Sequence, residues 1–104
     1  MPIIKVTKDN FEEEVKNSTV PVLCDFNAGW CGPCKVLGPI VEEIASERDD
    51  IKVVSIDIDE EEDLVDEYEV FSIPCLVLVK NGEEAGRSVG LKGKAEIIDF
   101  IEGK

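Results

Sequence analysis

Residues 20–26 read VPVLCDF and are apolar at nearly every position. A strand with one solvated face alternates apolar and polar residues, so an almost unbroken apolar run indicates a strand that is covered on both faces. Strands of this kind occur where helices cover both sides of a largely parallel sheet. The run therefore predicts an α/β domain. Asp25 is the one ionisable carboxylic acid in this predicted interior strand.

Strand and helix patterns alternate along the rest of the chain. The apolar positions from Leu37 to Ala45 recur with helical spacing, and Asn81-Gly82 is a strong hairpin signal. The segment Asp9-Asn10-Phe11-Glu12 has the character of a helix N-cap and capping box. The order βαβαβα followed by ββα predicts parallel strands with an antiparallel hairpin at the edge. Expected strands are 3–6, 20–26, 51–58, 76–79 and 86–89; expected helices begin at 9–12, span 33–48, begin at 59–62 and span 94–101.

Length and charge limit the classes of function. A chain of 104 residues suits a single domain, residues 1–104, and we expect a monomer. The net charge of −13 disfavours nucleic acid and anionic membranes as direct partners. The N-terminal residues show no basic region followed by a long apolar stretch, so we expect a cytoplasmic protein.

Two of the four cysteines, Cys31 and Cys34, stand three residues apart in the sequence GWCGPCK. They lie where the strand 20–26 passes into the helix 33–48, so Cys31 is expected at a helix N-terminus and Cys34 one turn inside. Side chains at positions i and i+3 of a helix lie ~5–6 Å apart, which is near the distance that a disulfide spans. The pair is thus predicted to open and close without a change of fold.

The same placement predicts different roles for the two sulfurs. Free N–H groups and the helix dipole stabilise a thiolate at Cys31, which is the attacking species in disulfide exchange. Cys34 is expected to face inward as a thiol and to resolve the mixed disulfide. The chain has no histidine, so Asp25, with a pKa raised by burial, is the candidate base for the Cys34 proton. Alternatively, backbone hydrogen bonds simply satisfy Asp25.

A zinc site is the alternative reading of a CxxC pair. It would need Cys24 and Cys75 as the remaining ligands, because there is no second CxxC and no histidine. We therefore predict no metal and no cofactor. Cys24 is expected to be a packing residue, whereas Cys75 is either a buried thiol or a redox-sensitive one.

These residues resemble the thioredoxin family. The resemblance rests on Asp25-Phe26, Trp30–Lys35 with the sequence WCGPCK, Pro39-Ile40, Ser72-Ile73-Pro74 and Val89-Gly90, and it extends over essentially the whole chain. It implies a thioredoxin fold, with a central five-stranded mixed β-sheet flanked by four α-helices. It also implies a protein-disulfide reductase that donates electrons to disulfide-forming enzymes.

The resemblance further implies a substrate surface around Cys31 and a recycling partner. Pro74 is expected to be cis, which leaves the Ile73 backbone free to pair with an extended substrate. A thioredoxin reductase, either flavin/NADPH or ferredoxin-linked, is expected to re-reduce the chain. Ordinary core packing is the alternative for Ile58 and Val89. The implied surface consists of Trp30, Gly32, Pro33, Ile58, Ile73, Pro74, Val89 and Gly90.

Three residues depart from the family pattern. Asn27 stands where many relatives have Trp, which predicts a looser wall behind the site. Ser55 stands where many have a Lys facing the buried acid, which predicts a more strongly raised pKa for Asp25. Cys75 stands where Thr is usual.

Two other functions remain open from the sequence. One is a binding subunit that uses the thioredoxin surface for assembly, with redox activity secondary. The other is a dedicated oxidant or isomerase, which the Gly-Pro pair inside the motif and the absence of an export signal disfavour.

Overall fold

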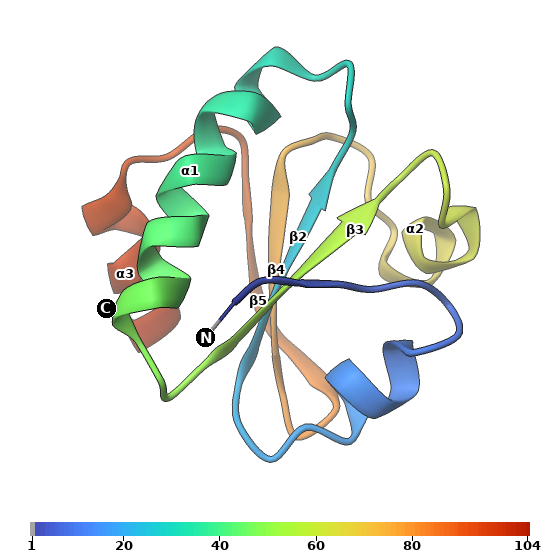
Figure 1. Cartoon of the computed structure of the whole chain (residues 1–104), viewed down its shortest axis with the longest axis horizontal. Coiled ribbons are helices and arrows are strands. Elements are labelled where there is room, and N and C mark those ends of the chain that lie inside the picture. The colour runs from blue at the N-terminus through green and yellow to red at the C-terminus, as the bar shows by residue number, and fades with distance from the viewer. Residues whose placement is uncertain (1) are drawn as a thin grey trace.

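A computed structural model describes residues 2–104 (Figure 1). Over these residues the chain forms one five-stranded sheet and four helices, of which three are α-helices and one is a short π-helix. The α/β architecture expected from the sequence is confirmed. The elements are β1 (Ile4–Lys5), η1 (Glu12–Lys16), β2 (Val22–Asn27), α1 (Gly32–Glu47), β3 (Lys52–Asp57), α2 (Glu62–Tyr68), β4 (Cys75–Lys80), β5 (Glu83–Val89) and α3 (Lys94–Glu102).

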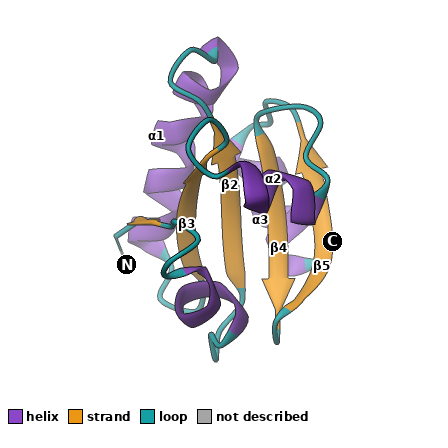
Figure 2. Cartoon of the chain, turned by 90° about the vertical axis from the view of Figure 1, so that its right-hand side faces the viewer, coloured by secondary structure: helices purple, strands orange, loops and turns teal. Residues whose placement is uncertain are grey.

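The sheet has the strand order β1-β3-β2-β4-β5 and is mixed. β1, β3 and β2 are parallel, whereas β4 runs antiparallel to both β2 and β5. Figure 2 shows the helices on the two sides of the sheet, with α1 and α3 behind it and α2 in front. The domain thus has three layers, and β2 lies at the centre of the middle layer.

The central strand is buried on both faces, as its apolar run predicts. Leu23 packs into the cluster under α1 and α3, which includes Leu37 and Ile97. Its neighbour Cys24 packs into the opposite cluster, which includes Phe11 and Leu64. Successive side chains of a strand point to opposite faces, so an apolar residue is required at each position.

The predicted capping box at the first helix is wrong. η1 begins at Glu12 with Phe11 at its N-cap position, and no side chain caps it. Asn10 serves the preceding turn instead: its Oδ1 accepts a hydrogen bond from the N–H of Thr7 at 2.7 Å, and its Nδ2 donates to the Lys5 carbonyl at 3.2 Å. A short polar side chain has several backbone groups within hydrogen-bonding reach. Here it bonds to the preceding turn, so it does not cap the helix.

The hairpin at Asn81-Gly82 is confirmed. Both residues have positive φ, 54° and 80°, as a tight two-residue turn requires. Because the turn is so short, pairing resumes at once with Lys80 opposite Glu83. β5 therefore starts three residues before the strand that the sequence predicts. Its first residues are exposed and charged, so they show no apolar pattern that would predict a strand.

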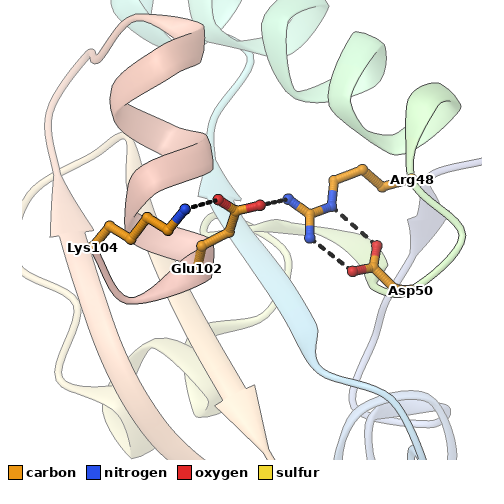
Figure 3. Close-up of polar contacts among 4 residues, drawn as sticks. All are labelled: Arg48, Asp50, Glu102 and Lys104. Atoms are coloured by element: carbon orange, nitrogen blue, oxygen red, sulfur yellow. Dashed lines mark hydrogen bonds and ion pairs between the residues drawn. The ribbon is translucent and has the colours of Figure 1, made fainter.

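Ion pairs between side chains join the C-terminal ends of α1 and α3 (Figure 3). Arg48, just after α1, donates to both carboxylate oxygens of Asp50 at 3.0 and 2.7 Å. It also donates to Glu102 at the end of α3 at 3.1 Å, and Lys104 pairs with the other oxygen of Glu102 at 3.5 Å. These contacts hold the two helices together at the end of the molecule opposite to the cysteine pair.

One end of the sheet gathers the residues singled out by the sequence. The carboxyl ends of β2 and β3, the first turn of α1 and the start of β4 meet there (Figure 1). Within residues 2–104 no helix is long and apolar enough to cross a membrane.

Candidate active site

Cys31 and Cys34 form a disulfide with their Cα atoms 5.3 Å apart. Cys31 is the N-cap residue of α1, and its Sγ accepts a hydrogen bond from the backbone N–H of Cys34 at 3.2 Å. Its own N–H donates to the carbonyl of Ala28 at 3.2 Å, which fixes the loop after β2. The predicted position at a helix N-terminus is confirmed, and the helix directs a backbone donor at the first sulfur.

That the reduced pair has an accessible Cys31 thiolate and a shielded Cys34 thiol stays a prediction. In the disulfide form both residues are buried: Cys31 is 5% exposed and Cys34 is 7% exposed. The reason is packing: Ile58 and Ile73, from the loops after β3 and before β4, lie against both cysteines and Ala28. The difference between the two sulfurs therefore rests on the hydrogen bond to Cys31 rather than on exposure.

Asp25 lies on β2, six residues before Cys31, and is 7% exposed. Burial raises the pKa of its carboxyl from 3.8 to about 6, and the side chain of Asn27 opposes the shift. Its Oδ1 has no hydrogen-bond partner among the described residues. The alternative that backbone hydrogen bonds satisfy this oxygen is therefore excluded, and the raised pKa is as predicted.

The buried acid and the second cysteine line the same cavity. Asn27, Ser55 and Lys5 of β1 line it as well. The Asn27 amide donates to the Ser55 hydroxyl and to the Asp25 backbone carbonyl, both at 2.9 Å. Asn27 was expected to leave a looser wall behind the site. Its hydrogen bond to Ser55 instead links β2 and β3 beside this cavity.

Two residues of the expected substrate surface, Ile58 and Ile73, pack against the cluster of Ala28, Cys31 and Cys34. Trp30 is 67% exposed and its Nε1 donates to Asp59 at 2.8 Å. The Ile73-Pro74 bond is cis, as predicted, and the Pro74 carbonyl accepts from the N–H of Gly90 at 2.8 Å. Gly90 has φ of 94°, which favours glycine.

The glycine and proline inside the motif form the start of α1. A Cβ atom on Gly32 would meet nothing within 4 Å, so this position faces open space. Pro33 occupies the first turn, where its missing N–H costs nothing. Val89, at the end of β5, is 47% exposed, whereas Ile58 is half-buried against the core.

Comparison with known proteins agrees with this geometry. The family model for thioredoxin matches residues 2–103. A thioredoxin of Rickettsia felis is 45% identical over 97 residues, which is 92% of this chain and 92% of the relative. A thioredoxin of Mycobacterium tuberculosis is 47% identical over 96 residues, which is 91% of this chain and 83% of the relative. The chain belongs to the thioredoxin family. Thioredoxins are disulfide oxidoreductases, and the chain is one of them.

The two remaining cysteines pack in a different hydrophobic cluster from the redox pair. Cys24 and Cys75 are buried free thiols in the cluster on the α2 side of the sheet. Burial raises the pKa of Cys24 to about 12 and also raises that of Cys75. A thiolate is disfavoured at both, which supports packing roles. The four cysteines do not surround a common point: over residues 2–104 no group of three or more Cys, Asp or Glu side chains is arranged to hold a metal ion.

Sequence reasoning missed three residues near the site. Asp59 orients Trp30 through the hydrogen bond described above. Phe71 is 90% exposed, two residues before Ile73, where an apolar side chain gains nothing from the core. Lys5 lines the cavity of Asp25. Phe71 had a sequence signal, an aromatic residue beside the Ser72-Ile73-Pro74 loop, whereas the other two depend on register between distant segments.

Proposed function

We propose that the chain reduces protein disulfides through Cys31 as nucleophile and Cys34 as resolving thiol. The Cys31 thiolate attacks one sulfur of a substrate disulfide, and the other substrate sulfur leaves as a thiolate and takes a proton. Cys34 then attacks the Cys31 sulfur, which releases the second substrate thiol and leaves the Cys31–Cys34 disulfide. Two electrons pass from the chain to the substrate. The observation that carries the proposal is the helix N-terminus at Cys31, where the Cys34 N–H meets the Cys31 sulfur.

Asp25 is proposed to take the Cys34 proton. A base that works near neutral pH needs a pKa near the working pH, and burial raises that of Asp25 to about 6. Asp25 and Cys34 line one cavity, which supports transfer directly or through water.

We propose that the substrate lies on the apolar surface around the disulfide. An extended segment is expected to pair with the backbone of Ile73 beside the cis-Pro74, in the manner of an added strand. The high exposure of Trp30 and the open space at Gly32 support close approach by another chain. The proposed contacts are Trp30, Gly32, Pro33, Ile58, Ile73, Pro74, Val89 and Gly90.

The partners in general are a reductase and disulfide-bearing proteins. We propose that a thioredoxin reductase, flavin/NADPH or ferredoxin-linked, returns the two electrons, and that the chain acts as a monomeric single domain in the cytoplasm. The free buried thiols Cys24 and Cys75 suit a reducing compartment. Supplying purified reductases of each class with the oxidised chain, and following thiol formation, identifies the electron source.

Replacement of Cys34 by Ser tests the proposal. C34S is expected to lose catalysis of insulin reduction by dithiothreitol, because the mixed disulfide on Cys31 is no longer resolved. The same variant is expected to trap substrates covalently, whereas C31S traps none and is the matched control. Wild-type turnover by C34S would mean that the chain works as a binding subunit or by another route.

A further inference from the structure

Three side chains form a row across the sheet and face the same cavity. Lys5 of β1 stands in register with Ser55 of β3, and Ser55 stands in register with Asp25 of β2. Residues in register on neighbouring strands point to the same side of a sheet. All three residues line the cavity that Cys34 also lines.

The spacing lets the two charges meet. Neighbouring strands lie ~4.8 Å apart, so two steps place the backbones of Lys5 and Asp25 ~10 Å apart. The four-carbon stem of a lysine reaches roughly 6 Å, and the aspartate side chain covers part of the rest. Ser55, between them, is too short to block this path, and its hydroxyl is held by the Asn27 amide at 2.9 Å. A longer residue at position 55 would fill the space that Lys5 must cross.

Lys5 now has a weak partner, and Asp25 has an oxygen with none. The Lys5 Nζ lies 3.2 Å from Glu60 Oε1, and the two side chains are 66% and 53% exposed. Exposed ion pairs of this kind contribute little to stability. The Oδ1 of Asp25 has no hydrogen-bond partner among residues 2–104. The buried carboxylate of an ionised Asp25 would attract the ammonium group more strongly than the exposed Glu60 does, because charges interact more strongly where water is excluded.

We propose that Lys5 is a positioning residue for the buried acid: its ammonium group leaves Glu60 and pairs with the Asp25 carboxylate when Asp25 ionises. This inference rests on the proposed function, because it supplies the cation that holds the charge Asp25 carries before it takes the Cys34 proton. Glu60 competes for the same ammonium group and so weakens the effect. Lys5 thereby replaces, from β1, the lysine that the family pattern places at position 55.

Other groups facing Asp25 do not serve this role in the same way. From α1, Lys35 and Glu42 line the cavity with opposite charges. From β4, the residue in register is the apolar Leu76. Cys24 and Cys75 also lie within electrostatic range of Asp25, and both are thiols with raised pKa values. Lys5 is the cation in the same sheet row.

A carboxyl titration followed by NMR on the oxidised protein tests the proposal directly. Lys5→Met is expected to raise the titration midpoint of Asp25 by about one pH unit, since an opposite charge near a carboxyl lowers its pKa. Lys5→Arg keeps the cation and is expected to restore most of the wild-type value. Lys8→Met removes an equal charge beside the loop 59–64 and is the matched control. A midpoint that moves no further in K5M than in K8M overturns the proposal.

The competing partner gives a second, opposite test. Glu60→Gln frees Lys5 and is expected to lower the Asp25 midpoint, and by more than Glu62→Gln, which removes an equal charge from an exposed neighbour. In a K5M background the E60Q shift should shrink to that of E62Q, because the two substitutions act through one ammonium group. An E60Q shift of the same size with and without Lys5 contradicts the exchange.

Activity separates this proposal from the proposed function. If both hold, the pH profile of insulin reduction moves upward in K5M together with the Asp25 midpoint. If the midpoint moves and the Asp25→Asn variant keeps the wild-type pH profile, then Lys5 pairs with Asp25 but Asp25 is not the proton carrier. The titration alone therefore decides the role of Lys5.

Discussion

At the scale of single residues, Asp25 has the most unusual environment. Burial holds its pKa at about 6, whereas the unfolded chain has the ordinary value of 3.8. The folded state therefore binds more protons than the unfolded state between these two values. Stability falls as pH rises through this window, and the whole loss is present above pH of about 6. The proposed base thus works at the expense of fold stability.

Asp25→Asn is expected to remove this loss of folding stability at high pH, because the amide does not ionise. A difference of about two pKa units corresponds to about 3 kcal/mol. The free energy of unfolding of D25N at pH 8 is therefore expected to exceed that of the wild type by about 2–3 kcal/mol. Near pH 3.5, where the acid is protonated in the folded state and mostly protonated in the unfolded state, the gain should nearly vanish. Urea unfolding at both pH values, with the exposed Asp66→Asn as control, measures this. An equal gain at both pH values would show that the effect is not linked to ionisation.

At the scale of elements, helices and strands with a strong hydrophobic pattern could be predicted from the sequence. The choice of a polar side chain between competing backbone partners could not. The apolar run of β2 and the helical stripe of α1 have only one arrangement that buries them, so the sequence predicts both. The N-terminus of η1 failed because Asn10 has nearer backbone partners than the helix offers. In the site, Cys31, Cys34 and Asp25 follow from local sequence. Lys5 and Asp59 do not, because their positions depend on pairing between segments more than 20 residues apart.

The loop between α2 and β4 carries an exposed aromatic residue beside the proposed substrate surface. Phe71 is 90% exposed, and Ile73, two residues on, packs against the cysteine pair. An exposed aromatic side chain at such an edge is typical of a contact that is buried only in a complex.

Phe71→Ser is therefore expected to lower kcat/KM for reduction of insulin by about 3–10-fold, because a contact with the protein substrate is lost. Reduction of a small aromatic disulfide, which does not extend to the loop, should be unchanged. Val36→Ser, at an exposed apolar position on α1, is the matched control. Equal losses on the protein and the small disulfide would place the effect in the redox pair instead of the surface.

At the scale of the whole molecule, charge opposes compactness. The chain carries 24 acidic and 11 basic residues, so most of its carboxylates have no basic side chain to pair with. Lys94, for example, lies within 2.7 Å of both Glu43 and Glu47, so one cation links α3 to two acids of α1. Such contacts fasten the helices locally, while the remaining carboxylates repel one another over the surface.

Salt decides which of these two effects is larger. Screening shortens the Debye length from ~30 Å at 0.01 M to ~3 Å at 1 M, so it weakens both long-range repulsion and exposed ion pairs. With a net charge of −13, repulsion should dominate, and the melting temperature at pH 7.5 is expected to rise by about 5 °C between 0.01 M and 1 M NaCl. At pH 4.5, close to the sequence pI of about 4.2, the rise should largely disappear. Calorimetry of the oxidised protein measures both. A fall in melting temperature at pH 7.5 would mean that the ion pairs at Arg48 and Lys94 outweigh the net charge.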